Sequence, residues 1–216
     1  MNIPLLVVIE TTPKKVFASA LEWPGLARAG GTEDEATAAL LTALPRYAPV
    51  TARAGHPLDP DRVALVVAQR LEGNSTTAFG APAVIADADR APSTAEDAAR
   101  LADLVEAAWQ ELDAVAATAP EALRKGPRGG GRDRSKILAH VMDAEAAYAQ
   151  VLGRKHRPVD AAAVAAMRGD LLELLRQPSD GSPVAGRKWP PRYAARRIAW
   201  HVLDHAWEIE DRSELD

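Results

Sequence analysis

Two histidines stand four residues apart near the C-terminal end of the chain, within the segment Trp200–Glu208. On an α-helix this spacing places His201 and His205 on one face, with their Cβ atoms about 5–6 Å apart. Two imidazoles in this arrangement can bind one divalent metal ion, through Zn–N bonds of about 2.0–2.1 Å. A third ligand has to come from another helix. His140 is the candidate, because it lies beside an apolar stripe at helical spacing and therefore faces inward.

Acidic side chains next to the histidine pair are the expected supporting groups. Glu208 shares the face of His205 and can serve as a ligand or as an acceptor for a ring N–H, and Asp204 is near enough in sequence to orient a ring. A plainer interpretation stays open, since histidines at this spacing also occur as core side chains that bind nothing. Three histidine ligands would leave positions on the ion open, as in catalytic rather than closed structural sites.

The remaining histidines are not expected to contribute to this site. His56 precedes a proline and His156 lies in a segment rich in lysine and arginine, so both are predicted to be exposed to solvent. Three imidazoles suit several divalent ions, and zinc or nickel is the expected metal.

The composition excludes several classes of function. The chain has no cysteine, so disulfides, thiolate nucleophiles and cysteine-held zinc are excluded, and a cytoplasmic location is favoured. Lysine and arginine number 26 against 30 aspartates and glutamates, which argues against a nucleic-acid partner. No apolar run is long enough to cross a membrane, and the N-terminus lacks the basic flank of a signal peptide.

The second half of the chain, residues 91–216, has no strand pattern and is predicted to be an all-α four-helix bundle. Apolar residues recur there at helical spacing in four stretches separated by short polar connections. Capping residues or prolines mark the expected starts of these helices: a Ser93–Glu96 capping box, Asp133 or Ser135, Asp160, and Pro190–Pro191.

The first half, residues 1–90, is predicted to be a small α+β unit of order strand, strand, helix, strand, with a connecting segment. The strands are expected at Leu5–Glu10, Lys14–Glu22 and Val63–Gln69, and the helix at the capping box Thr32–Glu35. Glycines and prolines indicate the loops and a helix end: Gly25, Gly30–Gly31, Pro45, Pro49, Pro57 and Pro60.

The segments Lys136–Glu145 and Ala199–Glu208 together resemble the DinB/YfiT-like superfamily of four-helix bundles. In that superfamily one histidine of the second helix and an H-x-x-x-H pair of the last helix bind a metal. The resemblance covers about residues 93–212 and implies that His140, His201 and His205 are the three ligands. It also implies a homodimer, because bundles of this kind often dimerise.

The N-terminal half resembles HicB-like antitoxin domains, which have a strand, strand, helix, strand fold. The resemblance is carried by Val16–Gly25 and Ala29–Ala36, followed by a helix, and it covers roughly residues 3–72. Such units usually mediate interactions with other proteins. No basic DNA-binding segment follows here, so the resemblance does not extend to repressor function.

A glycine-rich basic loop precedes the helix that carries His140. Its glycines leave backbone N–H groups accessible, and Lys125, Arg128 and Arg132 could hold an anionic group of a ligand at the start of the helix. The alternative is a solvated connection with no binding role.

Two functions from different classes follow from the sequence. Several DinB-like relatives are metal-dependent enzymes that use low-molecular-weight thiols such as mycothiol or bacillithiol, so the resemblance implies a thiol-dependent S-transferase, isomerase or hydrolase. Because this chain has no cysteine, the thiol would be part of a small-molecule substrate. The alternative is a non-enzymatic binding or assembly protein with a structural metal or none, in which the HicB-like unit contacts other proteins.

Overall fold

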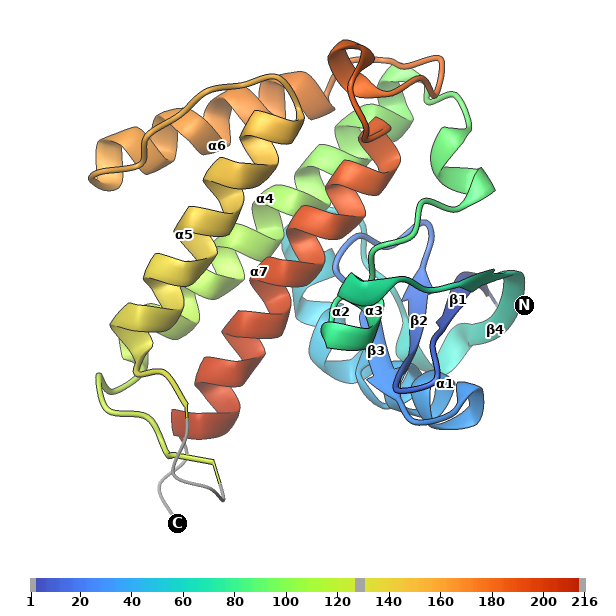
Figure 1. The fold of residues 1–216 in the computed structure, drawn as a ribbon, viewed down its shortest axis with the longest axis horizontal. Helices are drawn as coiled ribbons and strands as arrows, with labels where there is room; N and C mark the ends of the chain where they lie inside the picture. The colour runs from blue at the N-terminus through green and yellow to red at the C-terminus, as the bar shows by residue number, and fades with distance from the viewer. Residues whose placement is uncertain (1–2, 127–130, 214–216) are drawn as a thin grey trace.

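A computed structural model describes residues 3–126 and 131–213 of the chain. Figure 1 shows a small sheet with its helices on one side of the molecule and a group of long helices on the other. The predicted fold class, an α+β unit followed by a helical bundle, is confirmed.

The sheet has four strands in the order β3-β2-β1-β4. Their bounds are Ile3–Thr11 for β1, Val16–Ala20 for β2, Ala27–Gly30 for β3 and Val63–Glu72 for β4. Neighbouring strands are antiparallel except β1 and β4, which run parallel. The apolar run of β1 has strands on both sides, and Leu5, Val7 and Ile9 are buried in the main core.

Strand β3 corrects the sequence analysis, in which the glycine-flanked segment after Gly25 was expected to be a loop. The strand is only four residues long and pairs with β2 alone, at one edge of the sheet. A short edge strand has too few residues to show a pattern of its own and forms because its partner strand is in place.

The N-terminal helices also differ from expectation. Thr32 caps a helix at the predicted place, α1 (Glu33–Thr42), whereas the Glu35 carboxylate accepts from the N–H of Gly31 and not from that of Thr32. A second helix, α2 (Leu44–Arg53), follows at once, with Pro45 in its first turn and Pro49 inside it. The prediction that Pro49 lies in a loop is therefore wrong. A five-residue helix, α3 (Ser75–Phe79), follows β4.

Four long helices form the C-terminal half. Their bounds are Ala95–Thr118 for α4, Arg134–Val151 for α5, Ala161–Leu175 for α6 and Pro191–Ser213 for α7. The predicted starts at Asp133 and Asp160 are confirmed, although Asp133 makes no side-chain capping bond. The first capping box lies one residue later than predicted, because Thr94 and Asp97 form it.

Helix α7 is the central element that positions the histidines. It packs against α4 and α5, and Figure 1 shows it between α5 and the N-terminal sheet. The buried core is continuous from the sheet through α7 to the other long helices. Contacts between the sheet and α7 include an edge-to-face packing of the Phe17 and Trp200 rings and the Arg28 guanidinium, which lies 4.0 Å over the ring of Trp207. Of the helices that the structure describes, none has the length and apolar character needed to cross a membrane.

Candidate metal centre

Three imidazoles meet in the space between α5 and α7. His140 comes from α5, and His201 and His205 come from successive turns of α7. The ring centroids are 4.7 Å apart for His201 and His205, and His140 lies 5.2 Å and 5.0 Å from them. One ring nitrogen of each histidine can be chosen so that all three lie within 4.8 Å of one another. The three histidines therefore lie close enough to bind one metal ion.

The donor set fits a divalent ion of the transition series. Ligands that share a tetrahedral ion at about 2.1 Å lie roughly 3.4 Å from one another, so small rotations of the imidazoles complete the coordination. His201 is 7% exposed, and its Nδ1 atom is buried without a hydrogen-bond partner among the described residues. An unpaired buried nitrogen costs free energy, which a bound ligand nearby can offset.

Burial keeps two of the imidazoles in the form that binds metals. Burial, together with the neighbouring charges of His205 and Arg197, lowers the pKa of His201 to about 2. Burial also lowers the pKa of His140, and the charge of Arg132 acts in the same direction. A neutral imidazole has a free lone pair, so no proton has to be displaced from either side chain near neutral pH.

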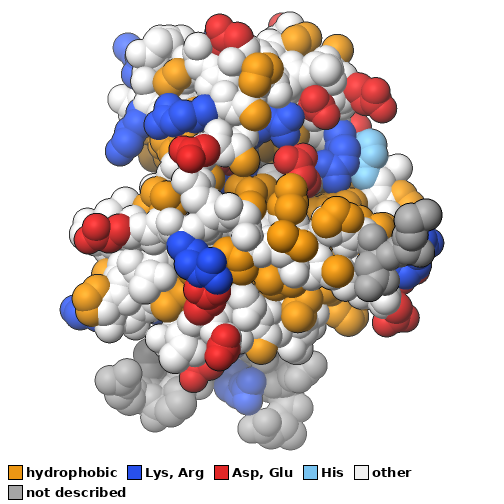
Figure 2. Space-filling view, turned by 90° about the vertical axis from the view of Figure 1, so that its right-hand side faces the viewer, with side chains coloured by type: hydrophobic (Ala, Val, Ile, Leu, Met, Phe, Trp, Pro, Cys, Tyr) orange, Lys and Arg blue, Asp and Glu red, His pale blue; other side chains and the backbone are white. Residues whose placement is uncertain are grey.

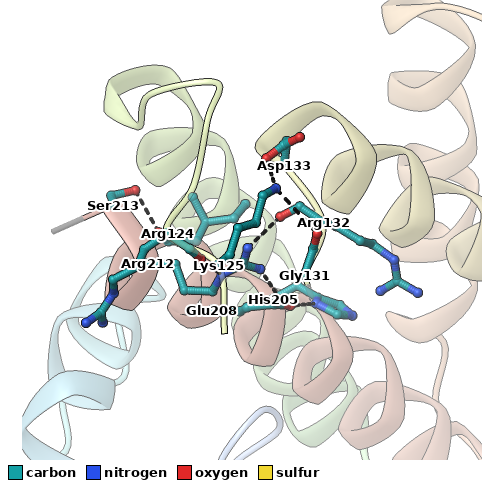
Figure 3. A network of polar contacts seen from close by, with 10 residues as sticks. Arg124, Lys125, Gly131, Arg132, Asp133, His205, Glu208, Arg212 and Ser213 are labelled. Atoms are coloured by element: carbon teal, nitrogen blue, oxygen red, sulfur yellow. Dashed lines mark hydrogen bonds and ion pairs between the residues drawn. The ribbon is translucent and has the colours of Figure 1, made fainter. Parts of the chain in front are cut away.

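Glu208 supports the third imidazole, as the sequence predicts. His205 donates from Nδ1 to Glu208 Oε2 at 2.8 Å, and this bond leaves Nε2 of the same ring available to an ion. The other carboxylate oxygen accepts from Arg212 Nη1 at 2.7 Å. Arg212 also donates to the main-chain oxygens of Arg124 and Arg132. The network in Figure 3 therefore connects the C-terminal end of α7 to the loop that precedes α5. This network fixes the orientation of the ring.

Asp204 has a different partner from the one expected. Its side chain is 48% exposed and forms an ion pair with Arg28 at 3.9 Å, whereas no bond to an imidazole is found among the described residues. It lines a groove of about 440 Å³ between α7 and the N-terminal unit, together with Arg28, Trp207 and Glu208. Asp204 thus links the helix to β3 rather than orienting a ring.

Of the three basic residues predicted to form an anion site before α5, Lys125 is already paired. Lys125 pairs with Asp133 and donates to the oxygen of Gly131 at 3.5 Å, so its charge is already compensated. Arg132 is exposed, and in Figure 3 its guanidinium extends to the same side as the His205 ring. Arg128 lies outside the described residues.

The two remaining histidines lie apart from the centre, as predicted, but they are less exposed than expected. Both are partly buried and each contacts an aspartate. His56 Nε2 lies 3.4 Å from Asp103, and His156 Nε2 lies 2.8 Å from Asp170. Contacts of this kind join segments that are distant in the sequence, so they could not be predicted from the residues around either histidine.

Three side chains beside the centre were not assigned to it from the sequence. The ring of Tyr148 lies 5.7 Å from His201 and 5.2 Å from Trp189. Arg197 lies over Tyr148 at 5.4 Å and over Trp200 at 4.8 Å. The spacing of Arg197 and His201, four residues apart on one helix, is the signal that could have indicated the arginine.

A scan of protein-family models, a search of curated proteins and a search of solved structures each give no match. The geometry and donor chemistry of the three histidines are therefore the basis for a functional assignment.

Proposed function

We propose that this chain is a DinB-like protein that binds one divalent metal ion, zinc or nickel, through His140, His201 and His205. The convergence of three imidazole nitrogens within 4.8 Å is the observation that supports it. Both the donor type and the absence of cysteine in the chain agree with imidazole-bound zinc or nickel.

The surrounding residues have separate roles in this proposal. Glu208 holds the His205 ring so that Nε2 faces the ion, and burial keeps the His201 imidazole neutral. A metal ion with an open position lowers the pKa of a bound thiol or water and so produces a nucleophile near neutral pH. The ring of Tyr148 lies beside His201, and Trp189 packs against the ring of Tyr148.

The reaction class that we propose is that of a metal-dependent enzyme acting on a small thiol or its adducts. An S-transferase, an isomerase and a hydrolase all fit a metal with open positions. Since the chain has no cysteine, the thiol belongs to a low-molecular-weight substrate. Turnover assays with mycothiol, bacillithiol and glutathione adducts test this class, and a metal-loaded protein that is inactive on all three would contradict it.

The metal proposal is tested by elemental analysis of protein purified without a histidine tag. We expect about one zinc or nickel per chain, and loss of the metal in His140→Ala, because two imidazoles alone leave the ion weakly held. His156→Ala is the matched control, since that ring bonds Asp170 and lies outside the centre.

Two other outcomes have distinct meanings. Unchanged metal content in His140→Ala would show that His140 is not a ligand. Loss of the fold together with the metal, measured by circular dichroism, would indicate a structural ion instead of a catalytic one.

A second candidate function, protein assembly through the N-terminal unit, is favoured by apolar side chains that this unit exposes. Leu6 and Val66 are partners in the register of β1 and β4 and are 37% and 44% exposed, and Ile3 is 36% exposed. Figure 2 shows hydrophobic side chains gathered across the middle of the face that carries the sheet. Neighbouring exposed apolar residues often mark a protein contact.

Analytical ultracentrifugation tests this candidate for the case in which the partner is a second copy of the chain. We expect a dimer that Leu6→Lys converts to a monomer, while Leu41→Lys, which changes an exposed leucine on α1, leaves it intact. A wild-type chain that sediments as a monomer at high concentration would contradict self-association.

A further inference from the structure

Arg197 lies next to the three-histidine centre. It precedes His201 by one helical turn, so the two side chains share a face of α7. Its guanidinium lies against the rings of Tyr148 and Trp200, and each of these rings also neighbours the His201 imidazole, at 5.7 Å and 6.2 Å. Two aromatic contacts fix the position of this guanidinium beside the imidazole.

Arg197 makes no direct contact with an acidic side chain that the structure describes, although Asp204 on the same helix interacts with its charge at longer range. Among the described residues it has no carboxylate partner, and its Nη1 atom is buried without a hydrogen-bond acceptor. The neighbouring arginines of α7 differ in this respect: Arg196 is bonded to Asp89, and Arg192 pairs with Glu22 and Asp97. A partly buried guanidinium without an acceptor costs free energy, which an anion can offset.

The small cavity on the sheet side of α7 cannot take such an anion. Its volume is about 10 Å³, and Arg197, Trp200 and Ser19 are among the residues that line it. This volume holds at most one water molecule. An anion larger than water therefore does not fit there, and the neighbours of Arg197 away from this cavity include Tyr148 and His201.

A second arginine adds positive charge to the same region. Arg132 has no acidic partner within the part of the chain that the structure describes, and in Figure 3 its guanidinium extends to the same side as the His205 ring. The nearest carboxylate of the network, Glu208, is already bonded to Arg212 and His205. The positive charges of Arg132 and Arg197 therefore act on the imidazoles alongside the negative charges of Asp143 and Glu208.

We propose that Arg197, assisted by Arg132, binds a carboxylate or phosphate group of the ligand beside the histidine centre. This inference rests on the proposed function, and it specifies the substrate class as an anion. A planar guanidinium held against two rings offers paired N–H donors to an oxyanion, a geometry that an ammonium group does not provide. The ring of Tyr148, with Trp189 packed against it, would be the aromatic surface nearest to the rest of the ligand.

The test is isothermal titration of the zinc-loaded protein with acetate and with inorganic phosphate. We expect Arg197→Gln to weaken binding of the preferred anion by about 10–100-fold, the loss typical of a charge-assisted hydrogen bond. Arg197→Lys should lose part of this affinity, because it keeps the charge without the paired donors. Arg192→Gln is the matched control and should bind like wild type, since its partners lie away from the centre.

The two probes identify the source of the anionic group. Tighter binding of acetate than of phosphate indicates a carboxylate ligand, and the reverse indicates a phosphorylated one. Equal affinity of wild type and Arg197→Gln for both probes, with zinc content and melting temperature unchanged, overturns the inference.

Measurements on the metal-free protein separate this inference from the proposed function. If no metal binds, phosphate or acetate binding that disappears in Arg197→Gln upholds the anion site while the metal proposal fails. If zinc binds but neither anion binds with or without it, the anion site is wrong and the metal proposal stands. The NMR chemical shift of the Arg197 Nε–H group provides a second measurement of anion binding that does not depend on calorimetry.

Discussion

At the scale of single residues, Glu208 divides its two carboxylate oxygens between His205 and Arg212. We predict that Glu208→Gln lowers metal affinity by about 10–100-fold, the usual cost of losing a carboxylate that orients a metal-bound imidazole. The dissociation constant is measured by competition with a chromophoric chelator. Asp204→Asn is the control, because this neighbouring acid pairs with Arg28 and should leave the affinity unchanged.

The same residues show how far the site could be predicted from the sequence. His201 and His205 share one helix, so their spacing alone places them together. His140 was predicted from its position beside an apolar stripe, which faces the core of any bundle. The contacts of Tyr148, Trp189 and Arg197 depend on how α5, α7 and the preceding loop pack against one another. Local spacing carries no information about such packing.

At the scale of elements, Glu145 joins three helices. Its buried carboxylate on α5 accepts from Trp109 on α4 at 2.7 Å and from Arg168 on α6 at 3.1 Å. Arg168 also bonds Asp113 of α4. Sequence analysis did not single out this acid, since glutamate is seldom fully buried. The junction sets the position of α6 across α4 and α5.

Burial raises the pKa of Glu145 above its ordinary value of 4.5, although Arg168 opposes the shift. The folded chain therefore holds this proton more tightly than the unfolded chain, and the free energy of unfolding falls as the pH rises above 4.5 through the raised pKa. Glu145→Gln does not ionise. We predict that the stability of wild type relative to this variant declines between pH 4.5 and pH 7.

Urea unfolding at several pH values measures this difference. A stability difference that stays constant with pH, or that shifts in favour of wild type as the pH rises, would contradict a raised pKa at Glu145. Asp113→Asn is a useful comparison, because the aspartate bonds the same arginine but its side chain is 65% exposed.

Elements with a pattern of their own were predicted better than those that depend on neighbours. Helices α5 to α7 and strand β1 have apolar patterns and boundary residues that can be recognised locally. Strand β3 depends on pairing with β2, and α2 continues past Pro45 because proline is tolerated in a first turn. Thr94 instead of Ser93 caps α4, while Ser93 pairs with Ser179 in an isolated bridge.

At the scale of the whole molecule, a buried ion pair connects the segment after β4 to α7. Arg196 donates to Asp89 with two bonds, of 2.8 Å and 2.6 Å, and the two side chains are 7% and 1% exposed. Asp89→Ala would leave the arginine buried without its partner. We predict a loss of about 3–5 kcal/mol in the free energy of unfolding, measured in urea.

The exposed pair of Glu33 and Arg70 is the control for this prediction. Their side chains are 35% and 63% exposed, so solvent screens the interaction and Glu33→Ala should cost far less. Similar losses in the two variants would mean that Asp89 is not the main partner of the buried arginine.

Gly25 lies so close to α7 that a larger residue at this position would weaken the packing between the N-terminal unit and the helix. Its φ is +98°, and a Cβ atom there would lie 2.6 Å from the Leu203 side chain and 3.5 Å from Ala199. Alanine at this position would be strained in the backbone and crowded against the helix. We expect this variant to be temperature-sensitive. On mild heating, the sheet would separate from the helix that carries two of the imidazoles.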